Sequence, residues 1–105
     1  MYIAMNRFKV APDMAEAFEE SWRTRQSFLK DMPGFVEFHM LKGHHHGEHI
    51  LYASHTVWRD RDAFEAWTRS EAFGASHRRA GGGSPKLFLG HPEFEGFEVF
   101  QHIAA

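Results

Sequence analysis

Apolar and polar positions alternate, or apolar and aromatic residues dominate, in four segments of the chain. Successive side chains on a β-strand point to opposite faces, so this pattern predicts strands. The predicted strands are residues 2–10, 35–42, 49–58 and 94–103. The second and third flank a turn rich in histidine and glycine, and we expect them to pair as a hairpin.

Two longer segments carry apolar residues at helical spacing. The first, residues 12–31, opens on Pro12, which suits the first helical position because that position needs no N–H donor. The second begins at Asp60, a good N-cap, and we expect Ser70 to break it. A further short helix is expected over residues 71–79. The apolar stripes consist of Met14, Phe18, Trp22 and Leu29 in the first helix and Ala63, Phe64 and Trp67 in the second.

The elements follow one another in the order β-α-β-β-α-β, which predicts an α+β fold of the ferredoxin-like type. In that arrangement the helices cover one face of an antiparallel sheet, and the other face is normally polar in a monomer. Here both faces are apolar, since Ile3 and Met5 alternate with Ala4 and Phe8 in the first strand. The simplest cover for the second face is another copy of the sheet. We therefore expect a two-fold homodimer with a barrel-like core, a dimeric α+β barrel.

Length, charge and composition narrow the possible functions. A chain of 105 residues fits one domain spanning residues 1–105. A formal net charge of −2 argues against a nucleic-acid partner, and the absence of cysteine excludes disulfides and thiolate chemistry. No apolar run approaches the roughly 20 residues that cross a membrane. The first residues lack the pattern of a secretory signal, so a cytoplasmic location is expected.

Three residues stand out as candidates for chemistry, and each also has an ordinary structural interpretation. His77 lies four residues after Phe73, so the two share a helical face; it is either a structural histidine or a metal ligand. Asn6 lies on an apolar side of the first strand. Its amide either bonds a neighbouring strand or points at a ligand. Trp67 either fills the core or contacts a ligand.

Other histidines and glycines carry weaker signals. His44, His45 and His46 adjoin one another on a turn, where adjacent side chains diverge, and are interpreted as surface residues that bind metal only adventitiously. His55 alternates with apolar residues and is interpreted as a core or interface histidine. The run of three glycines at 81–83 is a flexible loop, or else a flap beside a ligand.

The segment DAFEAWTRSEAFGASHR, residues 62–78, resembles the signature of the antibiotic biosynthesis monooxygenase superfamily, A-F-x-x-W-x-x-S-x-x-F-x-x-x-H. More narrowly, the whole chain resembles the IsdG-type heme-degrading monooxygenases in length and element order. The specific part of this resemblance is the combination of Asn6, Trp67 and His77. The first half of the signature is shared widely across the superfamily.

The resemblance implies a heme site with defined roles. His77 would be the proximal ligand of the heme iron, and Asn6 would lie on the distal side and hydrogen-bond the oxygen species there. Trp67 would press on the porphyrin and hold it out of plane. The remaining expected contacts to heme are those of Phe64, Phe73 and Arg78, the last as a cation that could pair with a propionate.

The resemblance further implies an enzyme that opens heme to a linear tetrapyrrole with O2 and releases iron. Electrons would come from an external donor, an electron-donating reductase, because the chain carries no nucleotide fingerprint. Two alternatives stay open. One is a cofactor-free monooxygenase of a small aromatic polyketide or quinol, in which His77 would be a general base or structural. The other is a heme-binding protein without turnover.

Overall fold

The computed structural model describes residues 1–25, 28–70 and 87–105. Its strands and α-helices follow one another in the order that the sequence predicts, and two short 3-10 helices are added. The elements are β1 (Tyr2–Val10), η1 (Pro12–Met14), α1 (Ala15–Arg23), η2 (Leu29–Asp31), β2 (Phe35–His46), β3 (His49–Trp58), α2 (Arg61–Thr68) and β4 (Leu89–Glu98). The short helix expected over residues 71–79 lies outside the described residues.

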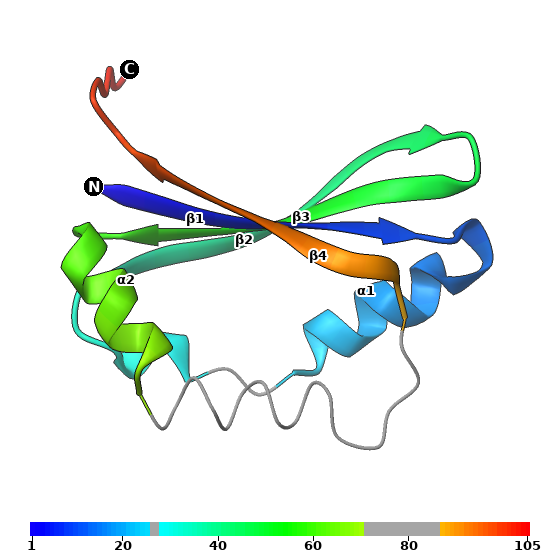
Figure 1. Ribbon diagram of the computed structural model, residues 1–105, viewed down its shortest axis with the longest axis horizontal. Helices are drawn as coiled ribbons and strands as arrows, with labels where there is room; N and C mark the ends of the chain where they lie inside the picture. The colour runs from blue at the N-terminus through cyan, green and yellow to red at the C-terminus, as the bar shows by residue number, and fades with distance from the viewer. Residues whose placement is uncertain (26–27, 71–86) are drawn as a thin grey trace.

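The four strands form one antiparallel sheet in the order β2-β3-β1-β4. Both α1 and α2 pack on the same face of this sheet, at opposite ends, and leave the other face open (Figure 1). This order and this one-sided cover are those of the ferredoxin-like α+β fold, so the predicted fold class is confirmed. None of the helices in the described ranges is long and apolar enough to cross a lipid bilayer.

The first predicted helix is wrong in its extent. A single helix was expected over residues 12–31, whereas α1 ends at Arg23 and η2 begins only at Leu29. At the end of α1 the Thr24 hydroxyl donates to the Glu20 carbonyl at 2.9 Å, a local bond of the kind that competes with helix continuation.

Two strands also differ from their predicted limits. β2 continues past Lys42 to His46 because the hairpin pairs through a register shift between Lys42 and His45. β4 was expected over 94–103 but spans 89–98. It is an edge strand whose pairing partner is β1, and β1 begins at Tyr2, opposite Glu98. Beyond that point the Val99 N–H still donates to the Met1 carbonyl at 2.9 Å, after which no strand lies opposite, and Phe100 is 96% exposed.

Two aromatic clusters fix the helices on the sheet. Beneath α1 lies the first cluster, formed by Phe8, Val10, Phe18 and Tyr52. Beneath α2 lies the second, formed by Tyr2, Ala4, Trp58, Ala63 and Trp67. Because the clusters occupy opposite ends of the sheet, the middle of this face is not covered by direct helix packing.

The open face of the sheet is only partly apolar, which corrects the expectation of two apolar faces: its apolar part lies where β1 begins, and further along it carries the ion pair of Arg7 with Glu95 at 3.2 Å. Cross-strand partners share a face, and Ile3 is directly opposite Val57 on one side and Phe97 on the other. Phe97 is 44% exposed. His55 lies on this face too; its ring centroid is 5.8 Å from that of His39, and its Nδ1 is buried without a hydrogen-bond partner among the described residues.

Gly34 provides the first prediction. It has φ of +82°, and a Cβ built on it would lie 2.5 Å from the Cβ of Ala63 in α2. We expect Gly34→Ala to lower the free energy of unfolding by about 2 kcal/mol or more, measured by urea denaturation, because backbone strain and a steric clash add. Gly47 is the matched control, since its φ is +59° with nothing near the added Cβ. Gly47→Ala should cost only about 1 kcal/mol, and equal losses would contradict the close approach of α2.

The apolar part of the open face provides the second prediction. We propose that a second copy of the chain covers it, as expected from the sequence. Phe97→Asp would then convert a dimer into a folded monomer, measured by sedimentation velocity with circular dichroism as the check on folding, because a carboxylate cannot be buried unpaired. Phe97→Leu is the conservative control and should remain dimeric. A monomeric wild type would refute the proposal.

Candidate active site: an aromatic cavity between the helices and the sheet

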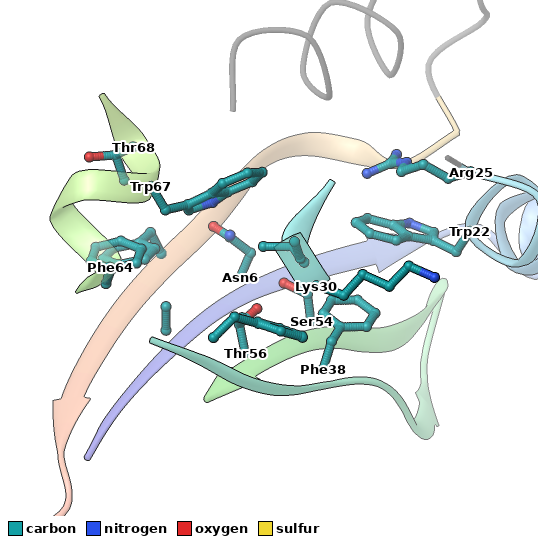
Figure 2. Close-up of a pocket in the computed structure, with 14 residues that line it drawn as sticks. Asn6, Trp22, Arg25, Lys30, Phe38, Ser54, Thr56, Phe64, Trp67 and Thr68 are labelled. Carbon is teal, nitrogen blue, oxygen red and sulfur yellow. The ribbon is translucent and has the colours of Figure 1, made fainter. Parts of the chain in front are cut away.

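A cavity of about 750 Å³ lies between the two helices on the covered face of the sheet. Its size falls within the roughly 300–1,000 Å³ usual for small-molecule sites. Residues from all four strands, both α-helices and η2 contribute to its walls (Figure 2). The lining residues are Ala4, Asn6, Trp22, Arg25, Leu29, Lys30, Phe35, Phe38, Ser54, Thr56, Phe64, Trp67, Thr68 and Phe94.

The floor of the cavity results from side-chain size along the sheet. On the covered face β3 carries Tyr52 and Trp58 at its two ends, which fill the aromatic clusters. Between them, on the same face, lie the small residues Ser54 and Thr56. Ala4 in β1, opposite Thr56, is also small. These small side chains leave space above the sheet where no helix covers it, and the floor of this space is partly polar.

The α2 wall presents aromatic surface to the cavity. Asp60 caps the helix as predicted: its carboxylate accepts a hydrogen bond from the Ala63 N–H at 2.8 Å, which keeps the pKa of Asp60 below its usual value with help from Arg59. From this fixed start Phe64 and Trp67 lie one turn apart on the sheet side.

Both aromatic residues of α2 are held by other rings. The ring centroids of Trp67 and Trp58 are 6.1 Å apart, and Phe64 stacks on Phe94 of β4 at 5.6 Å and 11°. Trp67 is only 7% exposed and belongs to the core cluster, yet it also lines the cavity. The two interpretations of this residue, core and ligand contact, are thus compatible.

The α1 wall is also aromatic. Trp22 stacks against Phe38 of β2 at 5.8 Å and 18°. The guanidinium of Arg25 lies over the Trp22 ring, 3.6 Å from its centroid, in a cation–π contact. Burial lowers the pKa of Arg25 below its ordinary value. Figure 2 shows Trp22 and Trp67 facing each other from opposite sides of the cavity.

A polar contact fixes α1, and with it Trp22, against the sheet. The Tyr52 hydroxyl donates to the Glu19 carboxylate, and Lys42 Nζ lies 2.8 Å from the same oxygen. The hydrogen bonds from Lys42 and Tyr52 lower the pKa of Glu19 to about 2. Trp22 follows Glu19 by three residues, so this contact sets where the indole enters the cavity.

Asn6 rises from the centre of the floor. It pairs with Ser54 on one side and Phe94 on the other, and its amide points up between Trp67 and Trp22 (Figure 2). Among the residues that the structure describes, its side chain makes no hydrogen bond. An amide among aromatic side chains needs a hydrogen-bond partner. Because the Asn6 amide points into the cavity, a bound ligand could supply that partner.

The structure brings three of the six predicted site residues together. Asn6, Phe64 and Trp67 come from distant parts of the sequence and line one cavity. Phe73, His77 and Arg78 lie outside the described residues. The loop of residues 81–83 lies outside them as well.

Several cavity residues were not singled out by the sequence. Ser54 and Thr56 could have been found, because they interrupt an otherwise large apolar face at period two. Trp22 was assigned only to the helix stripe. Arg25 and Lys30 had no detectable signal, since they reach the cavity through the break after α1 that the pattern did not predict.

The lining chemistry suits a flat, apolar and anionic ligand. Two indoles and several phenyl rings offer planar contact, and a small polar floor offers hydrogen bonds. Within the described ranges no group of three His, Cys, Asp or Glu side chains could hold a metal ion, and the histidines that end β2, instead of lying on the turn as expected, form no such site. The shape and lining define a small-molecule site, the usual location of activity in an uncharacterised domain.

Comparison with known proteins identifies the class. Residues 1–79 match the family model described as "Antibiotic biosynthesis monooxygenase". The chain therefore belongs to the antibiotic biosynthesis monooxygenase family. No curated protein sequence matches it.

Solved structures of similar fold include proteins with different ligands. A heme degrader, MhuD from Mycobacterium tuberculosis, solved with two hemes in its active site, has a TM-score of 0.78 at 24% identity, with 99% of this chain and 100% of that chain covered. A variant of SnoaB, a cofactor-independent oxygenase from Streptomyces nogalater, has a TM-score of 0.68 at 26% identity, covering 99% and 97%. A Streptomyces coelicolor monooxygenase solved with nanaomycin D has a TM-score of 0.69 at 19% identity, covering 99% and 91%.

The Glu19 contact predicts a pH dependence of stability. A carboxyl whose pKa falls on folding stabilises the native state above its unfolded pKa, and this contribution is lost as pH falls toward the folded pKa. For Glu19 the window runs from 4.5 down to about 2. The difference in urea midpoint between wild type and Glu19→Gln should be largest above pH 5 and shrink through that window. Glu48→Gln, on the exposed turn, is the control and should show no such trend; a difference independent of pH would contradict the contact.

Proposed function

We propose that the chain is a heme-degrading monooxygenase that binds heme in the aromatic cavity, opens the porphyrin with O2 and external electrons, and releases the iron. The observation that carries this proposal is the convergence of Asn6 and Trp67 on one cavity between α1 and α2. These residues are the described part of the combination by which the sequence resembles the heme-degrading branch of the family.

The cavity fits a porphyrin as substrate in three respects. Its volume of about 750 Å³ is large for a domain of 105 residues. Aromatic rings flank it from both helices, so a planar macrocycle would contact ring surfaces on α1 and α2. The lining contains cations but, among the described residues, no carboxylate, which suits a ligand bearing propionates. Heme, when bound, supplies the redox-active iron.

The proposed roles follow the position of each side chain. The Asn6 amide would donate a hydrogen bond at the centre of the ligand, since it points into the cavity from the floor. Trp67 would press on one side of the macrocycle and is braced for this by its contact with Trp58. His77 would hold the heme iron and Phe73 would contact the porphyrin; both roles are proposed on the family resemblance, because the two residues lie outside the described residues.

Partners and location belong to the same proposal. The electrons would come from a separate reductase, and the active form would be a homodimer in the cytoplasm. The similarity to MhuD supports heme as ligand, and the family to which the chain belongs supports an oxygenase.

A second candidate is a cofactor-free monooxygenase of a polycyclic aromatic substrate. The observation that favours it is the polar floor: Asn6, Ser54 and Thr56 adjoin one another and could hydrogen-bond a phenol or quinone oxygen. The likeness to SnoaB supports it further. In this case His77 would act as a base or be structural. A third candidate, a heme carrier without turnover, shares the heme cavity and differs only in activity.

The test is a titration of the tag-free protein with hemin, followed at the Soret band. Wild type should bind with saturation, and His77→Ala should weaken binding by roughly tenfold or more because an iron ligand is lost. His102→Ala, at an exposed terminal histidine, is the matched control and should bind as wild type does.

Addition of ascorbate then separates the enzyme from a carrier. The Soret band should bleach into a bilin spectrum with iron release, and Asn6→Ala should slow this by about 100-fold, the usual effect of removing one stabilising donor. Binding without bleaching would favour the carrier, and absence of specific hemin binding would leave the cofactor-free oxygenase.

A further inference from the structure

Three side chains with metal-binding atoms form a row across the open face of the sheet. His39 in β2 lies opposite His55 in β3, and His55 lies opposite Met5 in β1. Residues directly opposite each other on neighbouring strands have Cβ atoms roughly 4.5–5.5 Å apart. The row therefore brings two imidazoles and one thioether together, with His55 in the middle, and none of the three lines the cavity on the other face.

The spacing of the two imidazoles suits one shared ion. The ring centroids of His39 and His55 are 5.8 Å apart, and the ring planes are inclined at 48°. Two imidazoles that bind one ion through metal–nitrogen bonds of about 2 Å, at an angle of about 120°, have centroids roughly 5.5 Å apart. Small rotations of the two side chains would therefore bring one nitrogen of each ring to the same ion.

His55 adds an independent observation. Its Nδ1 is buried and has no hydrogen-bond partner among the described residues. A buried polar atom without a partner costs free energy, because it has lost its hydrogen bond to water. Imidazole nitrogen is the commonest metal ligand that proteins supply, and a metal ion bound to this ring would provide the missing partner.

The charges beside the row favour a cation. Glu37 lies on the same face two residues before His39, and Glu95 lies opposite Met5 at the other end of the row. Arg7, the next residue of β1 on this face, has its charge paired with Glu95 at 3.2 Å. Solvent reaches the row from the side of β2, because His39 is exposed and β2 is an edge strand.

We propose that His39, His55 and Met5 form a three-ligand site for a monovalent copper ion, Cu(I). Imidazole suits copper, and the soft thioether of methionine selects Cu(I) over harder ions. The described residues add no His, Cys, Asp or Glu to the two histidines, so Zn²⁺, which takes four ligands in structural sites, would have only two from the protein. The site lies on the opposite face of the sheet from the cavity and is independent of the proposed function.

A second pair of histidines on the same hairpin serves as an internal comparison. His46 lies opposite His49, and their ring centroids are 5.9 Å apart. In the described sheet β1 ends at Val10, opposite Ile50, so no residue of β1 lies opposite His49. This pair offers the same two imidazoles without the thioether, and it should hold Cu(I) less tightly.

The experiment measures Cu(I) affinity of the tag-free protein under argon, with ascorbate to keep copper reduced and bicinchoninate as the competing chromophoric chelator. The variants are His39→Asn, His55→Asn and Met5→Leu, the last of which keeps the side-chain volume. The matched control is the double variant His46→Asn/His49→Asn, which removes the other cross-strand pair. Thermal unfolding without copper checks that each variant folds, and X-ray absorption at the copper edge identifies the atoms bound to the ion.

We expect the tightest Cu(I) site of the wild type to hold one ion per chain, with a sulfur atom among the ligands. His39→Asn and His55→Asn should each weaken it by about 100-fold or more, and Met5→Leu by about tenfold or more, because each change removes a bond to the ion. The sulfur signal should disappear in Met5→Leu. The control double variant should keep both the affinity and the sulfur signal.

Two results would overturn the inference. Loss of the tightest site in the control double variant alone would place copper on the end of the hairpin. Unchanged affinity in Met5→Leu, with only nitrogen or oxygen bound to copper in the wild type, would exclude the thioether and with it the three-ligand site. The Met5→Leu comparison stands even if a histidine variant fails to fold, and hemin binding, which tests the proposed function, is measured separately.

Discussion

The two helices are held at opposite ends of one sheet face by separate aromatic clusters. Phe18 packs α1 against Phe8 and Tyr52, while Trp67 packs α2 against Trp58. Each cluster buries apolar surface that neither helix could bury alone, and this burial is the main source of stability for so small a domain. With the helices fixed apart, the small residues in the middle of the sheet face a hollow instead of a helix.

The cavity inherits its chemistry from this arrangement. The indoles that line it are also part of, or packed against, the clusters that hold the helices, so the walls are rigid where a planar ligand would bind. The contact of Glu19 with Tyr52 and Lys42 adds a directional constraint on α1 that apolar packing lacks. Preorganised walls reduce the entropy lost on binding, which is the usual requirement for precise positioning of a substrate.

The two faces of the sheet differ in their side chains. The open face carries Ile3, Val57 and Phe97 where β1 begins, a patch that suits an apolar partner, and the ion pair of Arg7 with Glu95 further along. The cavity on the covered face carries Arg25 and Lys30 and suits an anion. The same period-two alternation along β1 thus supplies one face for assembly and one for a ligand, with Asn6 at the centre of the second.

The sequence by itself determined the element order, the ferredoxin-like class, the cap at Asp60 and the apolar covered face, because these depend on local periodicity and backbone preference. It also singled out Asn6, Phe64 and Trp67, through a family resemblance. Only the tertiary structure decided that α1 ends at Arg23, that β4 stops at Glu98 opposite the start of β1, and that Arg25 and Lys30 reach the cavity. These features depend on contacts between segments distant in sequence, and no local pattern of residues encodes which partner a strand end meets or where a helix break points a side chain.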